Sequence, residues 1–310
     1  MALDFLKKQP TNVIICIFLL IWGAMFMVVG AIQPLLIPML TGDPNMNGKT
    51  FFEEGIVAYP NAYMLINVLS TACMFFLPAV LFTITVSDRP LEYLRLNQSI
   101  KSKQFILVTL GVLAIFPLIS GIGALLQQMH LGDTADALEA KRTLALNNYI
   151  KNGTILDLVK NLILVALIPA VFEELFFRGI IQRLAYSITR SPIGSFMLTS
   201  FIFTLFHASI YQFLPIFIGG IILCWVYYIT GNMKLNIWLH FLNNGIQIVL
   251  LYLSGQMVDN AQNQNIITIG IYLFVGIIMS VLLYTQLKKV ATPLPYEWHF
   301  NPYKQINQSK

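Results

Sequence analysis

Eight long apolar runs alternate with short polar segments along the 310-residue chain. They lie at 13–40, 61–86, 105–126, 161–182, 195–212, 213–229, 235–253 and 266–287. A helix needs about 20 mostly apolar residues to cross a bilayer. The pattern therefore predicts an all-α, polytopic membrane bundle of about eight transmembrane helices. The fourth and fifth runs are the least regular, because polar residues interrupt them.

Positive charges fall on every second connection between these runs, and short cytoplasmic loops are the ones that carry a Lys/Arg excess. The opposite connections carry mainly acids or no charge, and residues 127–160 are balanced. We therefore expect both termini to be cytoplasmic. The basic residues on the expected cytoplasmic side are Lys7, Lys8, Arg89, Arg95, Lys101, Lys103, Arg183, Arg190, Lys234, Lys288, Lys289, Lys304 and Lys310.

Composition supports the same class of protein. Hydrophobic residues make up 57% of the chain and charged residues only 11%, whereas about 25% of the residues in soluble domains are charged. The net charge of +5 follows from the topology, so we expect the lipid bilayer and no nucleic acid as a partner. The predicted location is an integral, multi-pass one, in the cell membrane if the chain is bacterial.

Three segments between the runs are expected at the surface. Residues 88–104 and 133–152 mix apolar and charged positions in a way that favours helices lying along the two membrane interfaces. The connection that contains Glu53 and Glu54 is expected to be a solvated loop.

Polar residues at membrane depth are concentrated between positions 173 and 244. An ionisable residue there costs at least about 2.5–3.5 kcal/mol on insertion scales, so it calls for a function or a partner. The fourth run contributes a carboxylate pair and an arginine, the fifth a histidine, and the seventh a histidine with two amides. They are Glu173, Glu174, Arg178, His207, His240, Asn243 and Asn244.

Helical spacing sorts the residues of the fourth run. Glu174 and Arg178 are four residues apart, so they share a helix face and can pair. Glu173 is rotated by about 100° from Glu174, which predicts that the two carboxylates do not serve the same partner and that Glu173 is free for another task. Pro169 removes the backbone donor to the carbonyl of Val165, and we expect a kink just before the carboxylates.

Two further pairs show the same spacing of four. His240 and Asn244 share one face of the seventh run, and Phe203 lies one turn below His207 in the fifth. Measured from the expected inner helix ends by the rise of 1.5 Å per residue, His207, Glu173 and His240 lie at depths of about 18, 15 and 9 Å. Only tilted or displaced helices can bring these three together.

The simplest interpretation of each residue alone is structural. Glu174–Arg178 is more often an ion pair inside a bundle than a catalytic pair, and a single histidine is more often a hydrogen-bonding residue between helices. For Asn243, packing or hydrogen bonding is favoured over a chemical role. Taken together, these residues could carry out a chemical reaction. A spare carboxylate, two imidazoles and an amide can activate water and stabilise an oxyanion, and His, His and carboxylate can also hold a metal.

These residues resemble the motifs of one family. Glu173–Arg178 is similar to EExxxR, Phe203–His207 to FxxxH and His240–Asn244 to HxxxN. In this order, each in an apolar segment, they are typical of the CPBP family of intramembrane proteases, which is related to the type II CAAX prenyl endopeptidases. The resemblance covers about residues 155–255. It implies a division into N-terminal transmembrane helices with interfacial segments (1–154), a catalytic core (155–255), and a last helix with a cytoplasmic tail (256–310).

The resemblance also implies a role for each motif residue. Glu173 would be the general base that activates water, and His207 would help to hold that water. His240 and Asn244 would bind the carbonyl of the bond that is cleaved. Glu174 and Arg178, with Phe203, would support the site. The family is often called metalloproteases, and a divalent metal such as zinc would fall to Glu173, His207 and His240. The mechanism can equally be written without a metal, and no HExxH motif is present.

The leading functional hypothesis is therefore a membrane endopeptidase. Its substrate would be a membrane-attached protein or peptide, cleaved close to the cytoplasmic leaflet and not necessarily prenylated. Two alternatives stay open. A transporter would use the same buried polar groups as an ion path, although no inverted repeat supports it. A non-catalytic scaffold or immunity-type protein would keep the fold without the chemistry.

Overall fold

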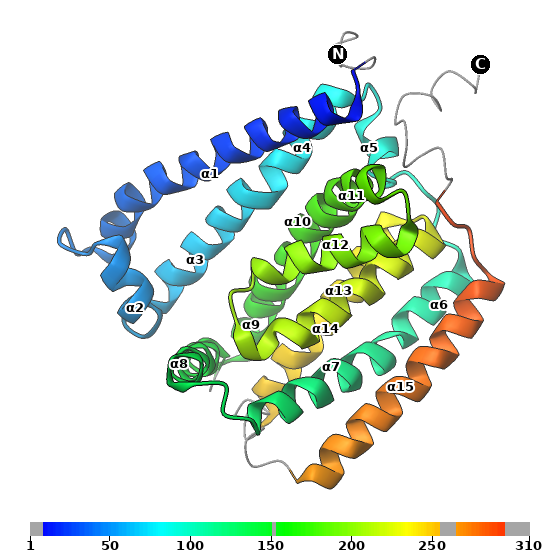
Figure 1. Ribbon diagram of the computed structural model, residues 1–310. Helices are drawn as coiled ribbons and strands as arrows, with labels where there is room; N and C mark the ends of the chain where they lie inside the picture. Colours follow the sequence, from blue (N-terminus) through cyan, green and yellow to red (C-terminus); the bar gives the residue numbers. More distant parts are fainter. Residues whose placement is uncertain (1–8, 151–152, 255–264, 295–310) are drawn as a thin grey trace.

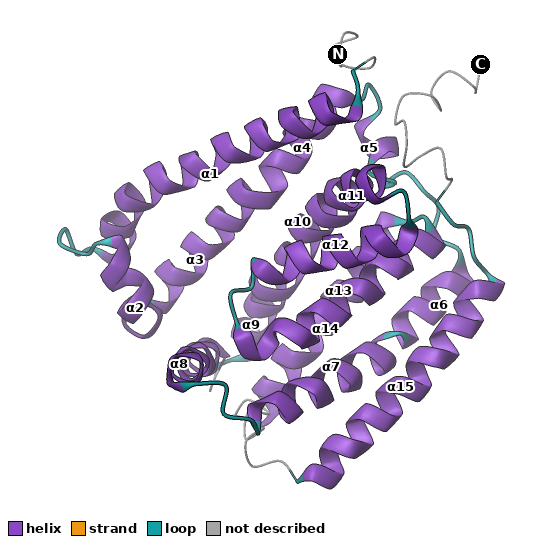
Figure 2. Cartoon of the chain, viewed as in Figure 1, coloured by secondary structure: helices purple, strands orange, loops and turns teal. Residues whose placement is uncertain are grey.

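The computed structural model describes residues 9–150, 153–254 and 265–294, and these ranges contain helices, turns and loops with no strand (Figure 2). The all-α expectation is confirmed. Lys7, Lys8, Lys304 and Lys310, and most of the tail of the predicted 256–310 segment, lie outside the described residues.

The helices form an elongated bundle whose members run mostly along one direction (Figure 1). The first half contains α1 Thr11–Thr41, α2 Gly48–Ala58, α3 Pro60–Thr71, α4 Leu77–Val86, α5 Pro90–Tyr93, α6 Ser102–Leu110, α7 Val112–Gln127 and α8 Asp133–Ile150. The second half contains α9 Ile155–Asn161, α10 Ile168–Phe176, α11 Gln182–Thr189, α12 Pro192–Leu205, α13 Ile210–Thr230, α14 Met233–Ser254 and α15 Ile266–Lys289. Three π-helical turns, Ala72–Phe76, Leu162–Leu167 and Phe177–Ile181, join neighbouring helices into longer ones.

Within the described ranges, six helical segments are long and apolar enough to cross a membrane. They are Thr11–Thr41, Pro60–Val86, Ser102–Gln127, Ile155–Thr189, Ile210–Thr230 and Ile266–Lys289. The chain is thus a multi-pass integral membrane protein, while the expected count of eight is not confirmed. Of the other two expected spans, one is the shorter apolar helix α12. The other is α14, which is not among these six segments.

The two expected interfacial helices have different outcomes. Residues 133–150 do form a surface helix, α8. The segment 88–104 does not, because the only helix that lies wholly within it is the four-residue α5. Arg95 then adopts a left-handed backbone with φ of 57°, which ends the helix, and regular structure resumes at Ser102 in α6.

Two other local expectations were wrong. The predicted loop around Glu53 and Glu54 contains the 11-residue helix α2, whose first turn is capped by the side chain of Asn47. Arg183 was expected in a loop, but the fourth helical segment continues to Thr189 and buries the Arg183 side chain. Its guanidinium lies 3.6 Å from the ring centre of Tyr93 on α5, so a cation–π contact takes the place of solvent.

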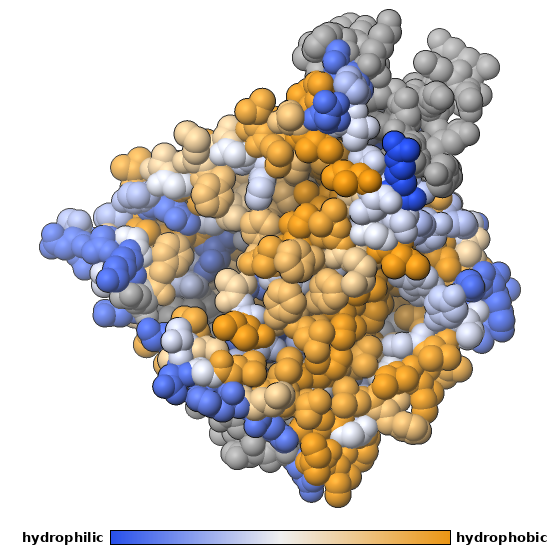
Figure 3. Space-filling model, viewed as in Figure 1, coloured by the Kyte–Doolittle hydropathy of each residue, from blue (hydrophilic) through white to orange (hydrophobic). Residues whose placement is uncertain are grey.

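The lateral surface of the bundle is apolar, as a lipid-facing surface must be. Figure 3 shows hydrophobic side chains over the flanks and hydrophilic ones gathered toward the two ends. On α1 alone, Leu20, Met27 and Leu35 are each more than 70% exposed. Water would penalise such exposure by about 25 cal/mol per Å², and hydrocarbon does not.

A cluster of phenylalanines packs the N-terminal helices against the fourth segment. Phe176 on α10 lies 5.5 Å from Phe18 on α1 and 5.1 Å from Phe75, measured between ring centres. Phe177 contacts Phe75 and Phe203 in the same way, at 5.3 and 4.9 Å. These tilted and edge-to-face contacts are the geometry that aromatic rings prefer, and they hold the segment that carries the two carboxylates.

A second, aliphatic interface joins α7 to α15, and α7 forms one wall of the cavity described below. Glycine allows the two helices to approach closely, as small residues do in membrane bundles. A Cβ at Gly276 of α15 would lie 2.6 Å from the backbone N and Cα of Leu118 on α7. The backbones therefore touch at this crossing.

We expect Gly276→Ala to separate α7 from α15 and to destabilise the folded chain by about 1–3 kcal/mol, as overpacking does. The measurement is thermal unfolding of the detergent-solubilised protein, in which the variant should have a lower Tm than the wild type.

Gly270, also on α15, provides the matched control, because a Cβ there meets no atom within 4 Å. Gly270→Ala should leave the Tm unchanged or raise it, since alanine is the better helix former by about 0.5–1 kcal/mol. Equal losses in the two variants would contradict the close crossing as the cause.

Candidate active site

The helical segment Ile155–Thr189 is irregular on both sides of its carboxylates. The π-helical turn Leu162–Leu167 comes just before Pro169, and the backbone N–H of Ile168 bonds five residues back, to Ile163. A second π-helical turn, Phe177–Ile181, follows them. Where a kink was expected before the carboxylates, the structure has a widened, π-helical turn. Such turns inside α-helices are frequent at functional sites.

Glu174 lies at the centre of a buried hydrogen-bond network. Its side chain has no exposed area, and its Oε1 accepts from Nη1 of Arg178 at 2.7 Å and from Nδ1 of His240 at 2.7 Å. Its Oε2 accepts from Nδ2 of Asn236. Because both oxygens are occupied by donors and no surface faces solvent, Glu174 is suited to holding other groups in place and not to abstracting a proton.

Arg178 is fully buried as well and reaches a third helix. Its Nη2 donates to the backbone carbonyl of Gly220 on α13 at 3.2 Å. Its guanidinium carbon lies 4.9 Å from the ring centre of Phe203 on α12. The predicted Glu174–Arg178 pair is thus present. Arg178 links it to α12 and α13, and Glu174 links it to α14.

His240 lies between the two carboxylates. While its Nδ1 bonds Glu174, its Nε2 lies 3.8 Å from Oε2 of Glu173. The expectation that the two carboxylates have no common partner was therefore wrong. The 100° rotation between them is real, but an imidazole has nitrogens on opposite sides and can face one carboxylate with each. The distance to Glu173 is too long for a direct hydrogen bond.

The bond to Glu174 also determines how His240 faces the cavity. An ionised carboxylate only accepts hydrogen bonds, so Nδ1 carries a proton and Nε2 is directed toward Glu173. The hydrogen bond made by one ring nitrogen fixes the role of the other.

Asn236 is a member of the site that the sequence motifs missed. It is fully buried and donates to Glu174 from α14. A signal for it was present in the sequence, because Asn236, His240 and Asn244 follow one another at intervals of four and share one face of a helix.

His207 does not lie within a span, contrary to expectation. Helix α12 ends at Leu205, and His207 occupies the turn before α13, where Ala208 takes a left-handed φ of 48°. The expected contact with Phe203 is present, with 4.6 Å between ring centres. Nδ1 of His207 also lies 2.9 Å from the carbonyl of Phe203. A proton on Nδ1 makes this a hydrogen bond and leaves Nε2 as an acceptor.

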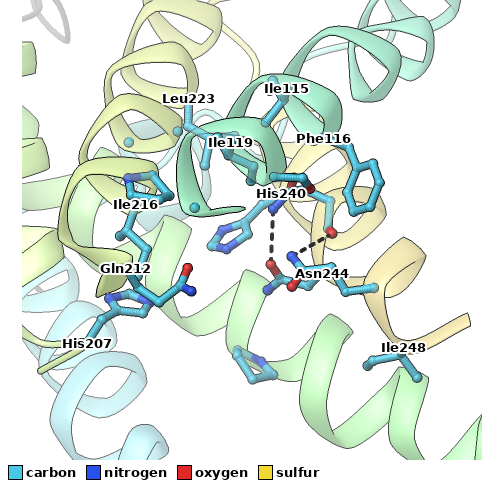
Figure 4. Close-up of a pocket in the computed structure, with 18 of the residues that line it drawn as sticks. Ile115, Phe116, Ile119, His207, Gln212, Ile216, Leu223, His240, Asn244 and Ile248 are labelled. Atoms are coloured by element: carbon cyan, nitrogen blue, oxygen red, sulfur yellow. Dashed lines mark hydrogen bonds between the residues drawn. The ribbon is translucent and has the colours of Figure 1, made fainter. Parts of the chain in front are cut away.

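Glu173, His207, His240 and Asn244 line one cavity of about 460 Å³. Figure 4 shows His207 and Gln212 on one side of it and His240 and Asn244 on another, with Ile115 and Ile119 of α7 above. The Glu173 side chain is 13% exposed. The side-chain oxygen of Asn244 lies 3.5 Å from Nδ2 of Asn243, the hydrogen-bonding role expected for Asn243. The four residues predicted to act together thus share one space.

The observed helix bounds remove part of the difference in depth expected from the sequence. The fourth segment ends at Thr189 rather than at Arg183, so Glu173 lies about 24 Å from its inner end, close to the value of about 22 Å for His207 counted from Pro192. His240 lies about 10 Å from Met233, the first residue of α14.

The surface helix α8 is attached to the turn that carries His207. Ser209 donates to Glu139 of α8 at 2.9 Å, and the hydroxyl of Tyr211 donates to Asp136. The bond from Tyr211, together with the nearby His130, lowers the pKa of Asp136. A lowered pKa means that this contact stabilises the folded chain above the ordinary Asp pKa and that the contribution is lost as the pH falls through the lowered value.

The described residues do not form a ready metal site. No group of three or more His, Cys, Asp or Glu side chains among them is placed to hold an ion. Nδ1 of His240 is bonded to Glu174, so this ring could offer an ion only its Nε2, which faces Glu173. Among the described residues, Glu173, His207 and His240 are not gathered around one point that could hold an ion.

The comparison with protein-family models gives one match, and it covers the segment that carries the site. Residues 155–246 match the model described as type II CAAX prenyl endopeptidase Rce1-like. This part of the chain is thus similar to the Rce1-like family, which agrees with the family that the motifs resemble. Apart from His130 and the residues of α7 and α8, all the residues of the site described above lie within the matched segment. Neither the curated proteins nor the solved structures gave a match.

Replacing Glu174 tests whether its network holds the helices of the matched segment together. Glu174→Gln would leave Arg178 buried without its counter-charge, and removing one partner of a buried ion pair costs about 3–5 kcal/mol. We expect a much lower Tm for the Glu174→Gln protein in detergent, and this measurement does not require an activity assay.

Glu92→Gln is the matched control, because it makes the same substitution in an ion pair at the surface. Glu92 forms an ion pair with Arg89 at 3.4 Å in which both side chains are at least half exposed. Such pairs contribute about 0–1 kcal/mol, so its Tm should hardly change. A Glu174→Gln protein as stable as Glu92→Gln would contradict the structural role of the buried carboxylate.

Proposed function

We propose that the chain is an intramembrane endopeptidase that hydrolyses a peptide bond of a membrane-attached protein or peptide, with Glu173 as the base that activates water. The observation that carries this proposal is that Glu173, His207, His240 and Asn244 line the same cavity. The Rce1-like match over residues 155–246 supports the reaction class. If the chain is bacterial, the enzyme acts in the cell membrane.

Glu173 is the carboxylate with the freedom to act as a base. Its neighbour Glu174 is saturated by three donors, whereas Glu173 faces the cavity with a partly exposed side chain. In the proposed first step, Glu173 takes a proton from a water molecule whose other contact is Nε2 of His207. The water oxygen then bonds to the carbonyl carbon of the substrate.

The developing oxyanion is stabilised from the other side of the cavity. His240 is bonded to Glu174 through Nδ1 and points Nε2 toward the space beside Glu173, where a proton on Nε2 would be donated to the oxyanion. Asn244 supplies an amide N–H from one turn further along α14. When the tetrahedral intermediate collapses, the C–N bond breaks and Glu173 returns its proton to the leaving amine.

Glu173→Gln removes the base while it keeps the size of the side chain. General-base catalysis contributes about 10²–10⁴-fold, so we expect the rate to fall at least about 100-fold. The protein is reconstituted in liposomes with a library of single-span membrane peptides, and new termini are detected by mass spectrometry.

Glu54→Gln is the matched control, because Glu54 is exposed on α2 and far along the chain from the cavity residues. The Glu54→Gln protein should cleave the peptides at the wild-type rate. Undiminished cleavage by the Glu173→Gln protein would contradict the assignment of the base.

Asn244→Ala tests the oxyanion contact separately. Loss of one oxyanion donor typically costs about 10²–10³-fold in kcat, and KM should change much less. An effect confined to KM would assign Asn244 to substrate binding and not to the transition state.

A further inference from the structure

The cavity reaches one end of the bundle and is closed toward the other. On α13 its lining runs from Gln212, near the first residue of the helix, to Leu223. On α14 it runs from His240 to Leu251, and on α7 it extends to the last residue, Gln127. It therefore stops about 10 Å, or seven residues, short of the far ends of α13 and α14.

The two ends of the bundle differ in charge. The closed end carries the described basic residues Arg89, Arg95, Lys101, Lys103, Arg183, Arg190, Lys234, Lys288 and Lys289. The open end carries Asp43, Asp133, Asp136, Glu139 and Asp157, with fewer basic residues to balance them. Figure 1 shows α8 lying across this open end, opposite the end where α11 stops and α14 begins. A Lys/Arg excess marks the cytoplasmic side, so the cavity opens away from the cytoplasm.

The rim of the opening is polar but has no positive charge. Gln127, Gln212 and Gln247 contribute amides from three different helices, and no Lys or Arg is among the described residues that line the cavity. Amide side chains both donate and accept, which suits the backbone of an extended peptide. Asp136 and Glu139 lie on α8 beside the same opening, and with Glu173 inside they repel a negatively charged segment.

We propose that the substrate enters from the non-cytoplasmic side and presents an uncharged stretch of peptide, without acidic residues next to the bond that is cleaved. The side of entry follows from the position of the cavity. The substrate class rests, in addition, on the proposed function. A cytoplasmic peptide is not the substrate on this inference, although the motif resemblance alone suggested cleavage near the cytoplasmic leaflet.

The side of entry is tested by the accessibility of single cysteines to a membrane-impermeant maleimide in intact cells. The background chain carries Cys16→Ala and Cys73→Ala and keeps Cys224, which is fully buried. Gln247→Cys, on the exposed rim, should react in intact cells. Asn97→Cys, exposed at the basic end, should react only after the membrane is permeabilised. Gln212→Cys provides a second rim position if the first variant folds poorly.

The inference would be overturned if the basic-end cysteine reacted in intact cells and the rim cysteine reacted only after permeabilisation. Equal protection of the rim and basic-end cysteines in intact cells would also overturn it. Adding Glu173→Gln to the rim variants should leave the labelling unchanged, because access does not depend on catalysis. The labelling result thus stands or falls independently of the proposed function.

The substrate class is tested with reporter peptides that cross the membrane once. The same uncharged segment is placed on either flank, and Asp is introduced beside the cleaved bond in a further version. We expect cleavage on the non-cytoplasmic flank and at least about a tenfold loss with Asp, since one unfavourable charge contact of about 1.4 kcal/mol suffices for that. Cleavage only on the cytoplasmic flank, or indifference to Asp, overturns the inference. If no reporter is cleaved while rim labelling persists, the proposed function fails and the side of entry remains supported.

Discussion

The buried carboxylate of Glu174 is the constraint on which the rest of the site depends. It holds Arg178 from its own helical segment and both His240 and Asn236 from α14. A charge at this depth is tolerated only because both carboxylate oxygens accept hydrogen bonds. The same hydrogen bonds restrict how the two helices can slide or rotate against each other, since any shift would leave a buried charge or amide without a partner.

The geometry of the chemical groups follows from this anchor. His240 is turned so that its second nitrogen faces Glu173, and Arg178 lies over Phe203, whose ring supports His207. Two adjacent glutamates therefore have different environments. One is enclosed and saturated, and the other is left beside a cavity, where a carboxylate interacts strongly with nearby groups because little water screens it.

One wall of the cavity comes from outside the motif-bearing segment. Helix α7 is held close by the glycine contact of Gly276 with Leu118. The surface helix α8 bonds the turn that carries His207 through Ser209 and Tyr211. These elements decide how large the space is and from which end it can be reached. The N-terminal half of the chain thus shapes a site whose reactive residues all lie in the other half.

Sequence alone determined the helical class and the membrane location, because hydrophobic runs are local properties of a helix, and the resemblance of its motifs to those of a protease family picked out the four cavity residues. It also predicted the Glu174–Arg178 pair. Only the tertiary structure decided that His240 faces both glutamates, that Asn236 completes the network and that the cavity opens at the less basic end. These depend on which helices meet and how each is rotated. Spacing along a single helix carries no information on either.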